Sequence, residues 1–477
     1  MSDQQSIVVI GAALAGASAA RALRDEGFAG EIRMLGAETH RPYIRPPLSK
    51  GFLAGADELD SVFVEAEGWY ASHDVTLSLG ETVDAIDPEA QFVFLASGEA
   101  LMYDKLLLTT GASPRALDVP GADLTGVFAL RTLDDSQGLR EALGGSAAGG
   151  EVSAGGGDAA GDSDGASPGA DTASGGVARV RRVVVIGSGW IGMEVAATAR
   201  TLGNEVTVLS RGEIPLASVL GDEVGRVFLE LHQEHGVVVR TGVEVAEVLG
   251  GGAEGGAGSA SAGASAGDCG SAAGVEGAAQ GGLAGGEGGV TGVRLTSGEV
   301  VPADVVVVGL GALPNIQLAE AAGLEIENGI VVNAALRTSD PNIWAAGDVA
   351  NAYHPVLKQR LRSEHWANAL NQGPAAAKSM LGKTVSYDEI PYFYSDQFDL
   401  GMEYSGYAPL THDATVVFRG DVAAREFIAF WVHGGRVVAG MNVNVWDVND
   451  AVQGIIRRAN VVDLARLADP AVPLDQI

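Results

Sequence analysis

Two glycine-rich segments, each directly following a short apolar run, limit most strongly how this chain can fold. The segment VVVIGSGWIGMEVAA places Gly187, Gly189 and Gly192 in the spacing G-x-G-x-x-G, between a predicted strand and a predicted helix. The first glycine of this pattern allows a tight turn, and a small central residue lets the backbone approach a pyrophosphate at the helix N-terminus. The segment therefore predicts a dinucleotide-binding fold.

The other segment, IVVIGAALAGASAA, repeats the pattern near the N-terminus with one substitution. Gly11 and Gly16 hold the outer positions, and Ala13 replaces the middle glycine. Small residues at these positions could also serve helix packing alone, so the motif by itself leaves both interpretations open. If a dinucleotide binds here, a polar group should contact its ribose after the next strand, and Glu38 is the available acid.

Around both motifs, nearly continuous apolar runs alternate with helical segments. Such runs with crossover helices predict parallel sheets that are buried on both faces. After about Pro391 the runs resemble antiparallel strands followed by a helix, which predicts a separate α+β domain. One predicted helix follows Gly11, a second ends at Leu202 and a third spans Val448–Arg458. The predicted strands are Ile7–Ile10, Glu31–Leu35, Arg182–Ile186, Glu205–Leu209, Thr415–Phe418, Glu426–Trp431 and Arg436–Asn442.

Two low-complexity tracts, Gly144–Ala178 and Gly250–Gly289, interrupt this pattern. Both consist mainly of Gly, Ala and Ser, so they cannot bury enough apolar surface to offset the entropy of ordering. They could form a regulatory or docking arm, but neither holds a motif or an aromatic anchor. We therefore interpret them as loop insertions, which loop-closure entropy penalises little.

Composition and charge exclude several classes of protein. The net charge of −31 argues against a nucleic-acid partner, which needs a surface of Lys and Arg. The apolar run from Ile7 to Ala22 contains glycines and follows no basic segment, so we interpret it neither as a signal peptide nor as a membrane span. We therefore expect a cytoplasmic protein without a membrane partner.

The residues after the strand Glu205–Leu209 bear on the choice of nicotinamide cofactor. An acid at this point would bind a ribose 2′-hydroxyl and repel a 2′-phosphate. The chain has Ser210 and Arg211 here, and a guanidinium is compatible with a 2′-phosphate. These residues favour NADPH, although Glu213 nearby leaves NADH open.

Several further motifs, taken together, resemble the ferredoxin reductases of bacterial oxygenase systems, of the putidaredoxin reductase and rubredoxin reductase type. This family is related to apoptosis-inducing factor. The motifs occur in the family's order over essentially the whole ordered chain. They are RPYIRPPLSKGFLAG (Arg41–Gly55), LLLTTGASPR (Leu106–Arg115), LRTLDDS (Leu130–Ser136), NIWAAGDVA (Asn342–Ala350), EHWANALNQG (Glu364–Gly373) and YFYSDQFD (Tyr392–Asp399).

The resemblance implies a glutathione-reductase-like α/β architecture with two Rossmann-like dinucleotide-binding domains and a C-terminal α+β domain. Residues 1–113 and 310–388 would form the FAD-binding domain. Residues 114–309 would form an inserted NAD(P)H-binding domain, and residues 389–477 a C-terminal interface domain.

The resemblance also implies which residues bind the cofactors. Asp348 would hold the ribityl chain of FAD, and Arg45 and Arg131 would contact the same cofactor. The remaining residues expected to bind FAD are Gly11, Leu14, Ala15, Gly16, Ala37, Glu38, Val83, Gly111, Gly347 and Trp366. Those expected at the nicotinamide nucleotide are Gly187, Gly189, Trp190, Ile191, Gly192, Glu194, Ser210, Arg211 and Gly309.

Lys50 and Glu194 are the expected catalytic residues. A glutamate at the start of an otherwise apolar helix needs a partner if it is buried. In the family, the lysine at this position lies beside flavin N5 and pairs with that glutamate, so the resemblance implies a Lys50–Glu194 pair. Lys50 would then stabilise negative charge on the reduced flavin.

Two aromatic residues are harder to interpret. Trp190 stands where relatives often place an aromatic that shields the nicotinamide pocket, and plain packing is an equal alternative. Tyr394 stands where many members of the family carry Trp, on the expected exit side of the flavin. Because of this departure, the sequence does not identify the surface through which electrons pass to the partner.

The single cysteine, Cys269, lies within the second low-complexity tract. Flavoenzymes that reduce disulfides need a pair of thiols beside the flavin, and peroxide-reducing relatives need one reactive thiol there. Electrons should therefore leave the flavin by another route.

The resulting prediction is an FAD-dependent NAD(P)H:ferredoxin oxidoreductase, monomeric or homodimeric. Its partner would be an iron–sulfur ferredoxin that serves a haem monooxygenase or a ring-hydroxylating oxygenase. The alternatives are an NAD(P)H dehydrogenase that reduces a quinone or ascorbate radical, and a redox-sensing module like apoptosis-inducing factor.

Overall fold

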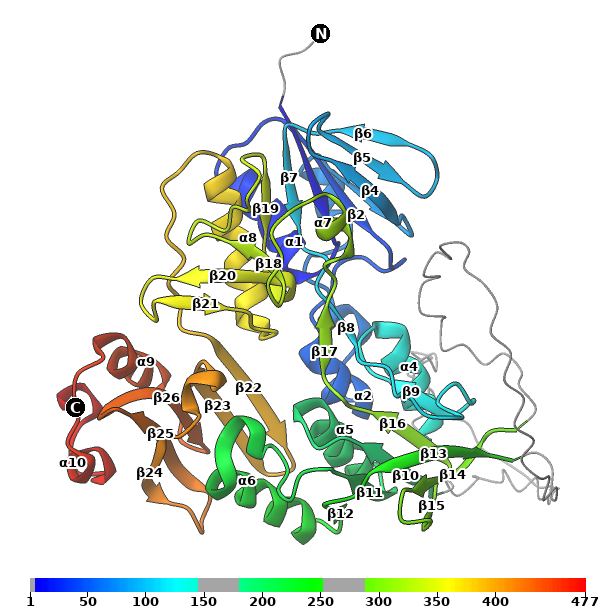
Figure 1. Cartoon of the computed structure of the whole chain (residues 1–477), viewed down its shortest axis with the longest axis vertical. Helices are drawn as coiled ribbons and strands as arrows, with labels where there is room; N and C mark the ends of the chain where they lie inside the picture. The colour runs from blue at the N-terminus through cyan, green and yellow to red at the C-terminus, as the bar shows by residue number, and fades with distance from the viewer. Residues whose placement is uncertain (1–4, 145–179, 252–287) are drawn as a thin grey trace, which may run out of the picture.

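The computed structural model describes residues 5–144, 180–251 and 288–477. Except for a few terminal residues, the two low-complexity tracts interpreted as loop insertions lie outside these ranges, as does Cys269. In Figure 1 the first parallel sheet lies above, and the second parallel sheet and the C-terminal sheet lie below it. Each helix in the described part of the chain is too short or too polar to cross a membrane.

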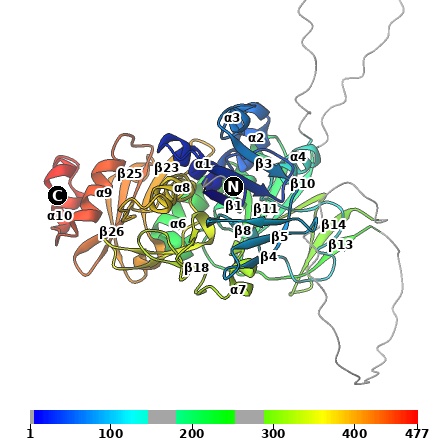
Figure 2. The same cartoon turned by 90° about the horizontal axis from the view of Figure 1, so that it is seen from above.

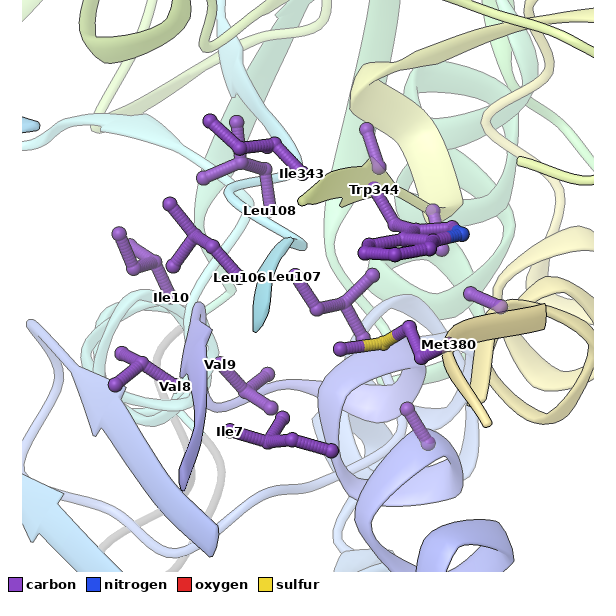
Figure 3. Close-up of a cluster of buried hydrophobic side chains, with 14 of the residues drawn as sticks. Ile7, Val8, Val9, Ile10, Leu106, Leu107, Leu108, Ile343, Trp344 and Met380 are labelled. Atoms are coloured by element: carbon purple, nitrogen blue, oxygen red, sulfur yellow. The ribbon is translucent and has the colours of Figure 1, made fainter. Parts of the chain in front are cut away.

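The first sheet has five strands in the order β19-β7-β1-β2-β3, and all its pairings are parallel. Its elements are β1 (Ser6–Ile10), β2 (Glu31–Gly36), β3 (Val75–Leu79), β7 (Lys105–Leu108) and β19 (Ile343–Ala345), with helices α1 (Leu14–Asp25) and α8 (Trp366–Met380) packed against each other. Figure 3 shows the buried side chains of β1, β7 and β19 filling its centre together with Met380. The sheet is buried on both faces, as its apolar runs predict.

The second sheet also has five parallel strands, in the order β12-β11-β10-β16-β9. Its elements are β9 (Val127–Ala129), β10 (Arg182–Ile186), β11 (Glu205–Leu209), β12 (Val238–Arg240) and β16 (Val305–Val308), with helices α4 (Leu133–Ala142), α5 (Trp190–Thr201) and α6 (Ala217–Glu234). The predicted strands at both glycine-rich motifs are therefore confirmed, and each runs directly into its turn and helix.

The C-terminal sheet is antiparallel, with the order β22-β23-β26-β25-β24. Its elements are β22 (Tyr392–Gln397), β23 (Leu400–Gly406), β24 (Thr415–Asp421), β25 (Glu426–His433) and β26 (Arg436–Val443), followed by α9 (Asn449–Arg458) and α10 (Leu464–Ala468). The three predicted strands and the helix are present, whereas β22 and β23 were not predicted. The view from above in Figure 2 places these elements at one end of the molecule. The predicted fold class is confirmed.

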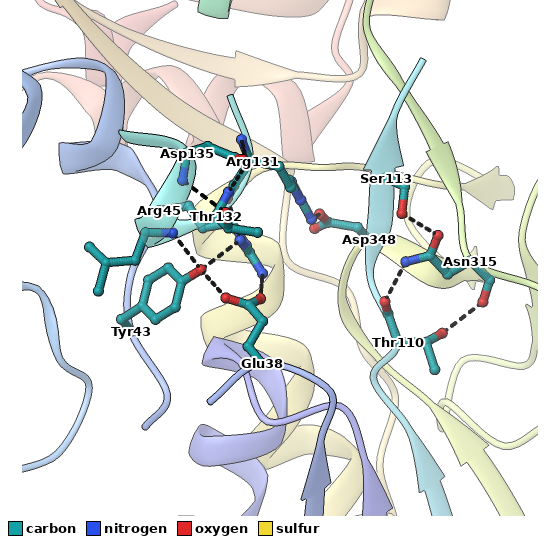
Figure 4. A network of polar contacts seen from close by, with 11 residues as sticks. Glu38, Tyr43, Arg45, Thr110, Ser113, Arg131, Thr132, Asp135, Asn315 and Asp348 are labelled. Carbon is teal, nitrogen blue, oxygen red and sulfur yellow. Dashed lines mark hydrogen bonds and ion pairs between the residues drawn. The ribbon is translucent and has the colours of Figure 1, made fainter. Parts of the chain in front are cut away.

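The two parallel sheets are joined by a pair of short antiparallel strands, β8 (Ala112–Pro114) and β17 (Ala312–Pro314). Asn315 donates to the Thr110 carbonyl oxygen at 2.8 Å, and the Thr110 hydroxyl donates to the Asn315 carbonyl oxygen at 2.7 Å (Figure 4). The chain passes from one parallel sheet to the other at β8 and again at β17, and these hydrogen bonds link the two connecting segments to each other.

Smaller elements complete the structure. Their bounds are β4 (Val83–Asp87), β5 (Phe92–Leu95), β6 (Ala100–Met102), β13 (Val245–Gly250), β14 (Val290–Leu295), β15 (Val300–Pro302), β18 (Ile330–Val332), β20 (Ala350–His354) and β21 (Gln359–Leu361), the short helices α2 (Gly51–Ala54), α3 (Trp69–Ser72) and α7 (Gln317–Ala321), and the 3-10 turns η1 (Pro46–Ser49), η2 (Leu59–Val62), η3 (Gly347–Val349), η4 (Ala408–Thr411) and η5 (Leu474–Gln476).

Candidate functional site

The first glycine-rich turn brings the start of α1 into close contact with the strands around it. Gly11 has a φ of +114°, and a Cβ on it would lie 2.1 Å from the carbonyl oxygen of Thr109. A Cβ on Gly16 would lie 2.3 Å from the carbonyl oxygen of Gly11. Both glycines are thus required by packing. The first turn of α1 carries no acidic residue, so its free N–H groups favour an anion.

In the second glycine-rich turn, two of the glycines are required by packing and the third leaves space for a ligand. Gly187 has a φ of +108°, and a Cβ on it would lie 2.2 Å from the Gly309 carbonyl oxygen. A Cβ on Gly192 would lie 2.3 Å from the Gly187 carbonyl oxygen. By contrast, a Cβ on Gly189 would meet no heavy atom within 4 Å in the described part of the chain. Gly189 therefore leaves open space at the N-terminus of α5, where a pyrophosphate can approach.

Glu38 lies after β2 in a polar cluster (Figure 4). Its carboxylate accepts hydrogen bonds from the Tyr43 hydroxyl and from Arg45, whose Nη2 lies 3.2 Å from Glu38 Oε1. Arg45 also donates to the Arg131 carbonyl oxygen. Burial raises the pKa of Tyr43, so its hydroxyl stays protonated and continues to donate. The expected ribose acid is thus fixed in orientation by two neighbours.

Asp348 and Arg131 form the centre of the expected FAD site. Arg131 Nη2 lies 2.7 Å from Asp348 Oδ2. Gly111 lies beside this pair, since a Cβ on it would be 3.5 Å from Arg131 Nη2. A Cβ on Gly347 would lie 3.1 Å from the Ala15 Cβ. The fold therefore brings these residues from separate chain segments to one place.

Three buried polar atoms without a hydrogen-bond partner among the described residues belong to Arg131 itself, to His365, which interacts electrostatically with Asp348, and to the next residue, Trp366. These atoms are Arg131 Nε, His365 Nδ1 and Trp366 Nε1. Burial lowers the pKa of His365 to about 4, so this side chain is neutral. Because buried polar atoms are normally satisfied, such a group points to a polar ligand at this place. The residues present therefore fit a cofactor with phosphate, ribityl and ring polar groups, such as FAD.

Lys50 and Glu194 are brought together by the packing of η1 and α2 against α5. Lys50 Nζ lies 2.8 Å from Glu194 Oε2, and Glu194 is only 4 % exposed. The predicted ion pair is present. Lys50 Nζ also lies 5.7 Å from the centre of the Tyr394 ring, which in turn lies 6.3 Å from the Trp366 ring. The ammonium thus lies between the second glycine-rich helix and the aromatic residues near Asp348.

Trp190 begins α5 and packs against aromatic residues of two other elements. Its ring centre lies 5.6 Å from that of Phe228 and 5.0 Å from that of Phe393. Trp190 therefore does pack against other aromatic side chains, as the packing interpretation expects. Its role in shielding the nicotinamide pocket stays a prediction. The next residue, Ile191, is 45 % exposed at the open side of the turn.

Ser210 and Arg211 lie after β11, beside the second turn. Ser210 is 3 % exposed, and its hydroxyl oxygen lies 2.8 Å from that of Ser188 inside the glycine-rich turn. Its hydroxyl also donates to the Gly212 carbonyl oxygen at 3.0 Å. Arg211 is exposed. Of the two, Arg211 is therefore the side chain that can reach a ligand, while Ser210 shapes the turn.

The other expected residues lie at the first turn, after β2 and at the start of β4. Leu14 and Ala15 are buried, Ala37 is exposed, and Val83 is buried at the start of β4. Sequence reasoning missed Tyr43, which donates to Glu38, Ser49 and Ser395, which donate to Glu194, and Gln397, which donates to Ser395. All four lie in motifs that carry the family resemblance, Tyr43 and Ser49 in Arg41–Gly55 and Ser395 and Gln397 in Tyr392–Asp399, and this was their only signal.

Comparison with known proteins agrees with this geometry. The family described as pyridine nucleotide-disulphide oxidoreductase matches residues 5–267 and 271–373, and a reductase C-terminal family matches residues 392–477. A probable ferredoxin reductase, CtmF, of Castellaniella defragrans is 35% identical over 99% of this chain and 98% of the relative. Putidaredoxin reductase CamA of Pseudomonas putida is 33% identical over 100% of this chain and 97% of the relative.

Among solved structures, the covalent putidaredoxin reductase–putidaredoxin complex matches with a TM-score of 0.80 and 32% identity, covering 99% of this chain and 97% of that chain. Unlike a disulphide reductase, this chain has one cysteine in total, so it has no pair of thiols of its own. The family resemblance predicted from the motifs is confirmed. The chain belongs to the pyridine nucleotide-disulphide oxidoreductase family and is an FAD-dependent oxidoreductase of the ferredoxin reductase group.

Proposed function

We propose that this chain is an NAD(P)H:ferredoxin oxidoreductase that delivers electrons to an iron–sulfur ferredoxin of an oxygenase system. The observation that carries the proposal is the Lys50–Glu194 ion pair, which links the segment between η1 and α2 to α5, the helix of the second glycine-rich turn, in a chain with a single cysteine. A thiol relay needs two cysteines or one at the flavin, whereas a one-electron protein acceptor needs neither.

When bound, FAD would accept a hydride from the nicotinamide and release the two electrons singly to the acceptor. Asp348 and Arg131 would hold its polar chain, and the first turn of α1 would bind its pyrophosphate. Glu38, fixed by Tyr43 and Arg45, would accept a hydrogen bond from its ribose. Lys50 would place positive charge beside the ring that becomes negative on reduction.

We propose NADPH as the preferred nicotinamide cofactor. The end of β11 carries no carboxylate, and Arg211 is exposed next to the turn that contains Gly189. An exposed guanidinium suits a 2′-phosphate, both as a charge and as a forked donor. Glu213, also exposed, is the nearest acid in sequence that could instead favour NADH.

The acceptor follows from the relatives. Putidaredoxin reductase has been captured in a covalent complex with putidaredoxin, and its group includes proteins named for oxygenase systems. We therefore propose a ferredoxin partner that serves a haem monooxygenase or a ring-hydroxylating oxygenase. We also propose the division into residues 1–113 with 310–388, residues 114–309 and residues 389–477, and a place in the cytoplasm.

Steady-state kinetics test the proposal. Purified, FAD-loaded protein is assayed with NADPH and NADH against several ferredoxins, a quinone and an ascorbate radical source. We expect the highest kcat/KM with a ferredoxin and with NADPH. Faster turnover with a quinone than with any ferredoxin would replace the proposed acceptor. A change of oligomeric state on reduction, with slow turnover for all acceptors, would favour a redox-sensing role.

A further inference from the structure

Both oxygens of the Glu194 carboxylate are occupied. Oε2 accepts from the Ser49 hydroxyl and lies 2.8 Å from Lys50 Nζ. Oε1 accepts from the hydroxyl of Ser395, at 2.7 Å. Ser395 belongs to β22 of the C-terminal sheet, so the carboxylate is held by residues from distant parts of the chain. A carboxylate bonded at both oxygens cannot rotate away from its lysine without breaking a hydrogen bond.

The bond from Ser395 is supported by two further buried residues. Gln397 Nε2 donates to Ser395 Oγ at 3.2 Å, and Gln397 Oε1 lies 2.8 Å from His232 Nε2 of α6. Ser395, Gln397 and His232 are 1%, 1% and 0% exposed. The three residues form a continuous hydrogen-bond chain that ends at Glu194. We refer to it below as the Glu194 chain.

The chemistry of its members gives the Glu194 chain one direction. A carboxylate only accepts, so the Ser395 hydroxyl must donate to it, and Ser395 Oγ then accepts from the Gln397 amide. The carbonyl oxygen of Gln397 needs a donor, which assigns the proton of the neutral His232 ring to Nε2. In each hydrogen bond of the Glu194 chain the donor therefore lies farther from Glu194 than the acceptor. Such a chain stabilises the charged carboxylate.

The strand β22 shows that this arrangement is not ordinary packing. Its buried positions Ser395 and Gln397 alternate with Tyr394 and Asp396, which face the other side and are less buried. The buried side of a strand usually carries apolar residues, because buried polar groups are costly without partners. Here they are polar, and both are used in the Glu194 chain.

We propose that Ser395 and Gln397, supported by His232, are positioning residues that fix Glu194 and, through it, the Lys50 ammonium at the flavin site. This inference rests on the proposed function. It adds the C-terminal sheet and α6 to the machinery that orients Lys50. Loss of a hydroxyl at Ser395 then lowers the rate of flavin reduction without removing any group that touches a cofactor.

The test is anaerobic stopped-flow reduction of the FAD-loaded full chain by NADPH and NADH. In Ser395→Ala, the limiting rate of flavin reduction is expected to fall about 10-fold, as for other residues that orient a functional group. The half-saturating nicotinamide concentration and the FAD content should stay within about 2-fold, since neither binding site is changed. Gln397→Met, which keeps side-chain length, should reduce the limiting rate in the same direction and covers the case in which Ser395→Ala does not fold.

Ser405 of β23 provides a matched control. It is also 1% exposed, donates to a side chain (Asn449 Oδ1, 2.6 Å) and accepts from a glutamine (Gln453 Nε2, 3.2 Å), but it is not part of the Glu194 chain. Ser405→Ala deletes the same hydroxyl from the same sheet. It is expected to leave the limiting rate within 2-fold of the unmodified protein.

A double variant shows whether Ser395 acts through Lys50. In a Lys50→Met background, adding Ser395→Ala should change the limiting rate by less than about 2-fold, because the group being positioned is gone. An equal fall in both backgrounds, or an unchanged rate in Ser395→Ala and Gln397→Met, overturns the inference while the proposed function stands. If the unmodified, FAD-loaded chain is not reduced by either nucleotide, the proposed function and the inference both fail.

Discussion

Arg131 and Asp348, which are 217 residues apart in the sequence, form an ion pair with 2.7 Å between Nη2 and Oδ2. Arg131 follows β9 of the second parallel sheet, and Asp348 follows β19 of the first. The pair therefore joins the carboxyl ends of strands from both sheets, which is where ligands bind in open α/β folds. His365 interacts electrostatically with Asp348, and the buried His365 Nδ1 and Trp366 Nε1 have no hydrogen-bond partner in the part of the chain that the structure describes.

Removing the Asp348 carboxylate should weaken FAD binding. Asp348→Ala deletes a charged acceptor, whose hydrogen bonds are worth about 1.5–3 kcal/mol, so the Kd for FAD should rise about 10- to 100-fold. Fluorescence titration of the apoprotein with FAD measures this. Asp304→Ala is the control, since Asp304 forms an Arg–Asp pair of the same 2.7 Å length with Arg182 at the second sheet. Equal losses of affinity in both variants would remove Asp348 from the FAD site.

Gly187 and Gly189 should respond differently to the same substitution. In Gly187→Ala the Cβ would lie 2.2 Å from the Gly309 carbonyl oxygen at a φ of +108°, so we expect a loss of stability of several kcal/mol. In Gly189→Ala the Cβ meets open space at a φ of −79°, so the fold should keep its stability. Since that space is where a pyrophosphate would approach, Gly189→Ala should instead raise the Kd for NADPH. Thermal unfolding and nucleotide titration of both variants separate the two effects.

Lys50→Met should slow flavin reduction while FAD is retained. The substitution keeps most of the side-chain volume but removes the charge that would stabilise the reduced ring, and such groups contribute about 10- to 1000-fold to rates. Ser49 and Ser395 still donate to Glu194, which limits the cost of leaving that acid without its cation. Single-turnover reduction and the flavin content of the purified variant are measured together. Normal reduction kinetics in Lys50→Met would exclude the electrostatic role.

Arg211 should determine part of the cofactor preference. Ser210→Glu combined with Arg211→Ala introduces an acid for a ribose hydroxyl and removes the exposed guanidinium, so kcat/KM should shift toward NADH by about 10-fold or more. Because the Ser210 hydroxyl is buried against Ser188, the single variant Arg211→Ala is needed to separate ligand contact from a disturbed turn. An unchanged NADPH/NADH ratio in both variants would show that this loop does not contact the 2′-position.

The strands and turns at Gly11 and Gly187 could be predicted because their signals are local. An apolar strand, a glycine at positive φ and an apolar helix follow one another within about 15 residues. Lys50 and Glu194 could be paired only through the family resemblance, since no local pattern relates residues so far apart. The burial of Glu194 explains why the pair is needed, because an unpaired charge at this place would be strongly destabilising.

The strand β22 was missed for a physical reason. A half-buried strand is recognised from apolar residues on its buried side, and Ser395 and Gln397 occupy that side. Their polarity is explained only by contacts with Glu194 and His232, which lie far away in the sequence. Where a functional arrangement overrides the usual pattern, sequence periodicity alone gives the wrong answer.

His232 should make the protein's stability depend on pH. Burial lowers the pKa of His232 to about 4, against an ordinary value of 6.5 in the unfolded chain. As pH falls through 6.5, the unfolded chain therefore gains a proton that the folded chain does not, and the free energy of unfolding decreases until about pH 4. Between pH 8 and pH 5 this contribution amounts to a loss of about 2 kcal/mol.

His232→Gln removes the titrating ring and keeps an amide that can donate to Gln397. The variant should be less stable than the unmodified protein at pH 8, because a well-packed ring is lost, but its stability should fall by about 2 kcal/mol less on going to pH 5. Urea unfolding with excess FAD at both pH values measures the difference. The control is His412→Gln, whose ring is 85% exposed and should leave the pH dependence unchanged. Because His365 is buried in all three proteins, its own titration cancels from the comparison. Identical pH slopes for His232→Gln and the unmodified protein would therefore mean that burial does not lower the pKa of His232 in the folded protein.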